Sequence, residues 1–150
     1  MTKKDFVVGN ISFDIKMDSV IKSFGLPKII DTIDVFRTSD FLGYHYDGFI
    51  VWADRRTHEI SSFDISKNEF MTQRGLKVGD SINKLIKLYG KGESVDELHM
   101  LYDIYDVRFK DYTKVIFYEY HPSDNDAYTV FFYIKHDKVV RIFMYHSLGC

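Results

Sequence analysis

The amino-acid sequence predicts an α+β fold made of two tandem modules, each with one short helix and an antiparallel sheet of three or four strands. Residues 75–92 repeat the apolar pattern of residues 10–27, with Gly90 aligned on Gly25. Each copy has helical spacing and is followed by runs with the alternation typical of strands. Aromatic residues make up 17% of the chain, which favours a large sheet. We expect both helices to lie on one face of one extended sheet.

The first module spans residues 10–65 and begins with a predicted helix. Its apolar residues recur at intervals of three and four, which is the helical period; they are Met17, Val20, Ile21 and Phe24. Asp14 is a candidate N-cap, and Gly25 followed by Pro27 indicates the helix end. The strand-like runs that follow are KIIDTIDVF, GYHYDGFIVWAD and HEISSFDIS, with a hairpin turn predicted at Asp54–Thr57.

The second module spans residues 75–146 and has the same order of elements. Its helical apolar residues are Ile82, Leu85, Ile86 and Tyr89. Asp80 or Ser81 is the expected N-cap, and Gly90 is the expected stop. The strand-like runs are LHMLYDIYDVRFKD, KVIFYEY and YTVFFYIKHDKVVRIFMYH, with turns at HPSDNDA and His136–Lys138. The segment VDELHMLY is also compatible with a helical turn. Together the modules predict a single compact unit over residues 1–150.

Charge and hydropathy exclude several classes of protein. The net charge is −2 and the lysines are interspersed with acids, so no basic stripe indicates nucleic-acid binding. The apolar runs, such as TVFFYI, are too short for a transmembrane helix. The N-terminal residues show no apolar stretch of a signal peptide. We therefore expect a cytoplasmic location, or the cell envelope or exterior if a preceding segment was removed. Cys150 is the single cysteine, which precludes an intrachain disulfide.

No motif in the chain indicates catalysis, a cofactor or a metal. The glycine-rich segment 75–92 lacks the Gly-Lys-Ser/Thr end of a phosphate-binding loop. The six histidines have no metal-ligand spacing, and no serine lies in a Gly-x-Ser-x-Gly turn. Asp124 and Asp126 lack the glycine and distal glutamate of a calcium loop, so they indicate a solvated hairpin tip. We predict a protein that is not an enzyme and that needs neither a metal nor a cofactor.

Aromatic side chains are the best candidates for binding residues. In IFYEYH and FFYIK they occupy both alternate sets of strand positions, so both faces of the sheet carry rings. One face must pack on the helices, and the other is expected to be an open aromatic surface that holds a partner. The alternatives are that a second copy of the chain covers this face, or that Trp52 is a core residue. The candidate binding residues are Tyr44, Tyr46, Trp52, Tyr118, Tyr120 and Tyr133.

The repeated segment resembles the module of the β-lactamase-inhibitor-protein-like superfamily, which includes SmpA/OmlA-type lipoproteins and secreted bacterial proteins. The resemblance rests on a loop glycine, an apolar helix face and an aromatic residue before a closing glycine. Gly79, Ile82, Leu85, Ile86, Tyr89 and Gly90 match this motif, as do Val20, Ile21, Phe24, Gly25 and Pro27. The motif's glycine is replaced by Asp14, and neither a lipobox cysteine nor the cysteine pairs of the secreted inhibitors are present. The resemblance therefore implies the fold rather than lipid anchoring or β-lactamase inhibition.

Two functions follow as hypotheses. The first is a non-catalytic protein-binding module, inhibitor-like or scaffolding, whose partner is another protein of unknown identity or a second copy in a homodimer. The second is a small-ligand-binding or hydrolytic protein whose histidine and aspartate residues meet only in the folded chain. An open aromatic face favours the first, and a closed pocket with converging histidine and aspartate favours the second.

The helix assignments make a prediction about stability. Leu85→Ala and Val20→Ala should each lower the free energy of unfolding by roughly 2–4 kcal/mol, because each removes a buried branched side chain. Urea unfolding monitored by circular dichroism measures the change. Midpoints equal to that of the wild type would show that the two segments are not equivalent core helices.

Overall fold

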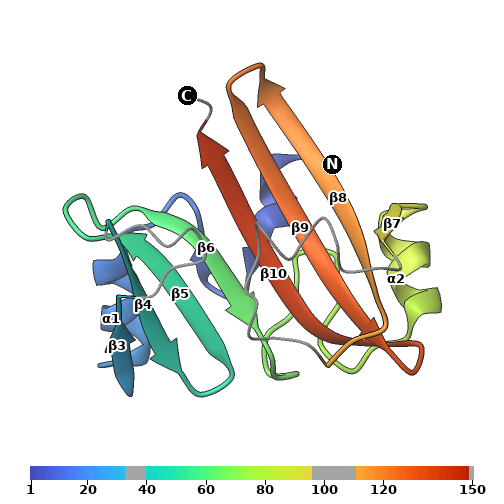
Figure 1. Cartoon of the computed structure of the whole chain (residues 1–150), viewed down its shortest axis with the longest axis horizontal. Helices are drawn as coiled ribbons and strands as arrows, with labels where there is room; N and C mark the ends of the chain where they lie inside the picture. The colour runs from blue at the N-terminus through green and yellow to red at the C-terminus, as the bar shows by residue number, and fades with distance from the viewer. Residues whose placement is uncertain (33–39, 96–110, 149–150) are drawn as a thin grey trace.

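The computed structural model describes residues 1–32, 40–95 and 111–148 and has an α+β architecture (Figure 1). The N-terminal elements are η1 (Lys3–Phe6), β1 (Val7–Val8), β2 (Ile11–Ser12) and α1 (Met17–Phe24). The next strands are β3 (Ile29–Asp31), β4 (Phe41–Tyr46), β5 (Phe49–Asp54) and β6 (Ile60–Ile65). Helix α2 (Ile82–Tyr89) precedes β7 (Glu93–Val95), β8 (Lys114–Ser123), β9 (Asp126–Lys135) and β10 (Lys138–Leu148). The strands predicted over residues 33–36 and 98–110, and the helical alternative for VDELHMLY, lie outside the described residues.

Strands β3 to β10 form one antiparallel sheet in the order β3-β4-β5-β6-β10-β9-β8-β7. The two halves of the chain meet where β6 pairs with β10, from Ile65 opposite Ile142 to Ser62 opposite Tyr145. The pairing of β10 with β9 continues to Leu148. Strands β6 and β10 therefore separate beyond Tyr145, and Figure 1 shows the resulting opening between the two groups of strands.

The helix boundaries agree with the predicted periodicity, but one predicted cap is wrong. The Ser81 hydroxyl accepts the amide N–H of Lys84 at 3.2 Å, as expected for the N-cap of α2. In α1 the N-cap position is Lys16 rather than Asp14. The chain is extended at Lys16, and the amide of Met17 donates to the carbonyl of His58 at 2.8 Å. This amide is thus satisfied by the turn between β5 and β6 and needs no side-chain cap.

Both helices end at glycines, and both pack on the same face of the sheet. The φ angles of Gly25 and Gly90 are 79° and 80°, which are left-handed values that favour glycine. The side chains that the helices bury join one apolar cluster with alternate residues of the strands. This helix-side cluster includes Met17, Val20, Val51, Phe63, Leu85, Tyr89, Val130 and Phe132.

The opposite face of the sheet is also buried, so the expected open aromatic face is wrong. A second apolar cluster lies there, in which every side chain is at most 4% exposed; its members are Trp52, Val115, Phe131, Tyr133 and Phe143. Aromatic residues at both alternate sets of strand positions therefore indicate a sheet with two buried faces. A strand covered on both sides is apolar throughout its length, unlike a strand with one solvated face.

An ion pair ties the N-terminal segment to the loop before α2. The Arg74 guanidinium donates to the Asp5 carboxylate at 2.7 and 3.1 Å and to the carbonyl of Leu88 at 2.9 Å. Burial alone would raise the pKa of Asp5, but hydrogen bonds from Arg74 and from the Thr2 amide hold it below its usual value. This contact anchors the segment that leads through β1 and β2 to α1.

A second, fully buried ion pair crosses the junction of β6 and β10. Asp64 lies opposite Phe143, so Arg141 is its diagonal neighbour on the face away from the helices. The Arg141 Nε–H donates to Asp64 at 2.6 Å, and a second guanidinium nitrogen donates to the other carboxylate oxygen. Both side chains are 5% exposed. The Arg141 guanidinium also lies 5.4 Å from the ring centre of Tyr133.

This pair makes a testable contribution to stability. Arg141→Met should lower the free energy of unfolding by about 3–5 kcal/mol, because it leaves the buried Asp64 carboxylate without its counter-ion. Adding Asp64→Leu to that variant should recover part of the loss, since neither charge of this pair then remains to be buried. Urea unfolding of the single and double variants measures both effects. A single variant as stable as the wild type would contradict this role.

Candidate functional site

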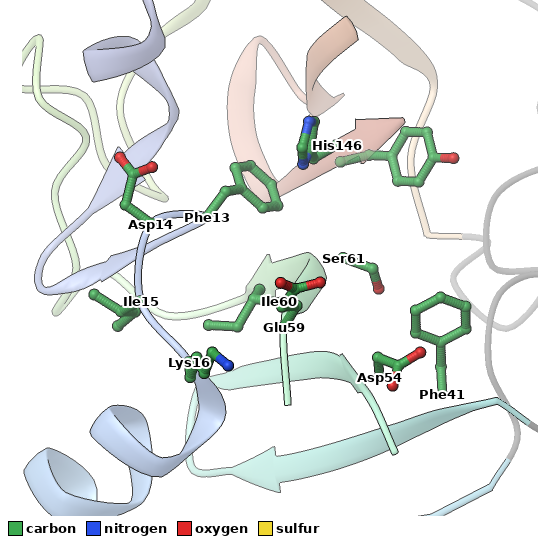
Figure 2. Close-up of a pocket in the computed structure, with 11 residues that line it drawn as sticks. Phe13, Asp14, Ile15, Lys16, Phe41, Asp54, Glu59, Ile60, Ser61 and His146 are labelled. Atoms are coloured by element: carbon green, nitrogen blue, oxygen red, sulfur yellow. The ribbon is translucent and has the colours of Figure 1, made fainter. Parts of the chain in front are cut away.

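A cleft of about 580 Å³ opens at the point where β6 and β10 separate. Figure 2 shows its residues converging from the segment before α1, from the adjoining ends of β4 and β5, from the start of β6 and from the end of β10. Its apolar side chains are Phe13, Ile15, Phe41, Ile60 and Tyr145. Its polar side chains are Asp14, Lys16, Asp54, Glu59, Ser61 and His146. The volume is in the range of sites that bind small molecules or single side chains.

The segment between β2 and α1 forms one wall of the cleft. An antiparallel bridge between Lys16 and Glu59 attaches the segment to the start of β6. The ring of Phe13 packs on Phe63 at a centroid distance of 5.0 Å and on His146 at 5.5 Å. These contacts reach both β6 and β10, so the segment fixes the width of the opening.

Three carboxylates line the cleft in different environments. Asp54 accepts the amide N–H groups of Arg56 and Thr57 at 2.7 and 2.8 Å. These hydrogen bonds, that of Thr57 first, hold the pKa of Asp54 below its usual value and keep the group ionised. Glu59 accepts a hydrogen bond from the Thr57 hydroxyl at 3.3 Å. Asp14 pairs with the exposed ammonium of Lys3.

His146 borders the cleft and pairs with Asp126. An ionised carboxylate can only accept, so the Nε2–H of His146 donates to Asp126. The imidazole stacks on the Tyr128 ring at 4.2 Å and 5°. The Ser61 hydroxyl donates to the carbonyl of Trp52 at 3.2 Å. Within residues 1–32, 40–95 and 111–148, no hydroxyl or thiol hydrogen-bonds to His146, which is the pairing that activates a nucleophile.

Contrary to the prediction, the six aromatic residues proposed for binding do not form one exposed surface. Tyr44, Tyr46, Tyr118 and Tyr120 belong to the helix-side cluster or pack against it, and Trp52 and Tyr133 lie on the opposite face. Four of them, Tyr44, Trp52, Tyr118 and Tyr133, are at most 8% exposed, and the other two are half-buried. The strand register divides the set between two faces, and both faces are covered.

Two of these tyrosines hold the helix ends. The hydroxyl of Tyr46 donates to the carbonyl of Gly25 at 2.8 Å, and that of Tyr118 donates to the carbonyl of Gly90 at 2.8 Å. These carbonyls follow the last helical turn and have no partner within the helix. Both contacts are structural, and neither presents a ring to a partner.

Exposed apolar side chains gather instead at the β3 edge of the sheet. Leu26, Ile29 and Ile30 are 84%, 61% and 54% exposed. We call these three residues the β3 edge patch. A signal in the sequence could have found it: Ile29 and Ile30 are consecutive, so a strand cannot bury both on one face. The cleft residues carry no comparable signal.

The described residues provide neither a metal site nor a membrane-spanning helix. No group of three or more histidine, cysteine, aspartate or glutamate side chains in that part of the chain is placed to hold a metal ion. No helix there is long and apolar enough to cross a membrane.

Comparison with known proteins supports the fold and no function. No protein-family model and no curated protein sequence matches the chain. The fold is similar to part of an extracellular protein containing an SCP domain from Bacillus anthracis, with a TM-score of 0.51 and 7% sequence identity. The match covers 87% of this chain and 42% of that protein, so the chain spans less than half of its length. At this identity the likeness concerns the fold alone.

The burial of Trp52 can be tested directly, because it is the single tryptophan. Its side chain is 1% exposed, so its fluorescence should be blue-shifted from that of free tryptophan and insensitive to iodide. Unfolding in urea should remove both properties. Strong quenching of the Trp52 fluorescence by iodide in the folded protein would contradict this burial and support an exposed aromatic face.

Proposed function

We propose that this chain is a non-catalytic protein-binding module and that its partner adds an extended strand at the edge strand β3. The observation that supports this proposal is the β3 edge patch. An edge strand presents unpaired backbone groups, and exposed apolar side chains beside it supply pockets and contact area. Strand addition uses both features: the backbone pairing gives affinity, and the alternate side chains give specificity.

The other edge of the same sheet provides an internal comparison. Strand β7 occupies the opposite end of the strand order, and its Glu93 and Ser94 are exposed polar residues. A charged, polar edge is the usual protection against unwanted pairing. Because β7 completes the sheet with exposed Glu93 and Ser94, an edge strand of this fold does not require isoleucines at its exposed positions. The exposed isoleucines of the β3 edge are therefore best explained by a partner there.

The proposed family is the β-lactamase-inhibitor-protein-like superfamily, with two copies of one module in the chain. Each helix ends at a glycine with nearly the same φ, and a tyrosine hydroxyl from a following strand caps each glycine carbonyl. The strand order is also symmetric about the junction of β6 and β10. These parallels support a duplicated module, and the inhibitor-like or scaffolding role is proposed from the resemblance to that superfamily.

The alternative function is a small-ligand-binding or hydrolytic role at the cleft. The pairing of Asp126 with His146 beside the cleft favours it, since a carboxylate commonly orients a histidine base. Hydrolysis further requires a nucleophile or a bound water next to that histidine. We therefore prefer a binding function for the chain.

Substitution at the edge tests the proposal. Ile29→Lys and Ile30→Lys should each weaken partner binding about tenfold or more, because a lysine cannot be buried in an apolar contact without cost. The fold should be retained, since both positions are exposed and surface changes rarely exceed about 0.5 kcal/mol. The measurement is affinity capture from a lysate of the source organism, with captured proteins quantified by mass spectrometry.

Ser94→Lys is the matched control, because it places the same charge on the polar edge strand β7. The proposal predicts a partner captured equally by the wild type and the control and lost with both isoleucine variants. Equal capture by all four proteins would refute binding at β3. A wild-type homodimer that dissociates in the isoleucine variants, seen by analytical ultracentrifugation, would replace the foreign partner with a second copy.

A further inference from the structure

The cleft between β6 and β10 has the features of a separate ligand site. It lies at the centre of the strand order, whereas the β3 edge patch lies at one end. Its walls carry the aromatic rings of Phe13 and Phe41, which Figure 2 shows, and Tyr145 also lines it. Such walls favour an apolar body, and the faces of aromatic rings also attract cations.

The charges that line the cleft are mainly negative. Asp14, Asp54 and Glu59 contribute three carboxylates, and Lys16 contributes one ammonium group. The charge of Asp14 is already matched by Lys3 outside the cleft. Asp54 is held ionised mainly by the backbone amides of Thr57 and Arg56, and the charge of the Arg56 side chain makes a smaller contribution. Counted over the residues that line it, three carboxylates against one ammonium group, the cleft carries a net negative charge.

Glu59 is the carboxylate best placed to receive a ligand. Its hydrogen bond from the Thr57 hydroxyl is long, at 3.3 Å. In the described part of the chain it forms no ion pair, although Lys16 is its bridge partner in the backbone. Figure 2 shows its carboxylate in the middle of the cleft, between the Phe13 wall and the Asp54 wall.

We infer that the cleft binds an organic cation, namely an ammonium or guanidinium group carried on an apolar chain. The apolar chain lies against Phe13, Ile60 and Tyr145, and the cationic group is paired with Glu59, with Asp54 adding long-range attraction. A free amine and a basic side chain of a peptide share this chemistry. The experiment below separates these two sources.

The test compares ligands of the same shape and different charge on the full chain. The probes are 4-phenylbutylamine, its neutral analogue 4-phenylbutanol and its anionic analogue 4-phenylbutyrate. The amine should bind about fivefold or more tightly than the alcohol, because one partly exposed ion pair is worth about that factor. It should also shift the backbone NMR signals of Phe13, Ser61 and His146. An alcohol or an acid that binds as well as the amine would overturn the inference, as would the absence of amine binding.

Glu59→Gln assigns the effect to the cleft. This variant should weaken the amine about fivefold and leave the alcohol unchanged. Glu119→Gln is the matched control, because Glu119 is an exposed carboxylate on β8 that does not line the cleft. Thermal unfolding of both variants verifies that they fold. An amine affinity that is equal in the wild type and in a folded Glu59→Gln variant would overturn the inference.

Acetyl-Phe-Lys-amide and its Nε-acetylated form identify the source of the cation. A lysine peptide that binds more tightly than 4-phenylbutylamine and loses affinity on acetylation indicates that the natural ligand is a basic side chain. A lysine peptide that binds more weakly than the amine indicates a free amine. Both outcomes support the inference. The site is independent of the proposed partner at β3, so Ile30→Lys should bind the amine as the wild type does. A negative result for the cleft therefore does not bear on partner binding at β3, and a negative result at β3 does not bear on the cleft.

Discussion

The pairing of β6 with β10 is the contact on which the rest of the structure depends, because it joins strands from the two halves of the chain into one sheet. Only four residue pairs form this junction, from Ile65–Ile142 to Ser62–Tyr145. The Asp64–Arg141 ion pair crosses it with both side chains buried. A buried pair of this kind penalises alternative registers, since a shift of one residue would place the two charges on opposite faces of the sheet. The same junction, where it ends, opens the cleft.

Two buried faces explain the unusual use of aromatic residues. A sheet with helices on one side needs apolar residues at alternate positions only, but Trp52, Phe131 and Phe143 occupy the other set and are almost fully buried. In such a sheet the aromatic residues pack in the two buried clusters. The tyrosine hydroxyls then serve structural carbonyls, as Tyr46 does at Gly25 and Tyr118 at Gly90. We therefore expect ligand-binding residues where the hydrogen-bonded pairing of the strands ends.

Regular pairing stops at two kinds of place in this sheet. At the outer edge, β3 leaves the side chains of Ile29 and Ile30 exposed, whereas β7 exposes the polar residues Glu93 and Ser94. At the junction, the separation of β6 from β10 leaves a cleft bordered by Glu59 and His146. The edge supplies apolar surface and backbone groups, and the cleft supplies charge. These differences suit a protein strand at one place and a small cation at the other.

The sequence by itself determined the local elements of this protein. The two helices, Met17–Phe24 and Ile82–Tyr89, and their glycine stops could be predicted from the sequence, because helical spacing depends on residues that are near neighbours in the chain. The α+β class and the antiparallel strands followed from the same local patterns. Only the tertiary structure decided which aromatic residues are buried, because this depends on which strands meet and what covers each face. The cleft could not be predicted from the sequence either. Phe13, Glu59 and His146 line it together only because of the register of β6 with β10, which is a long-range pairing that no local pattern encodes.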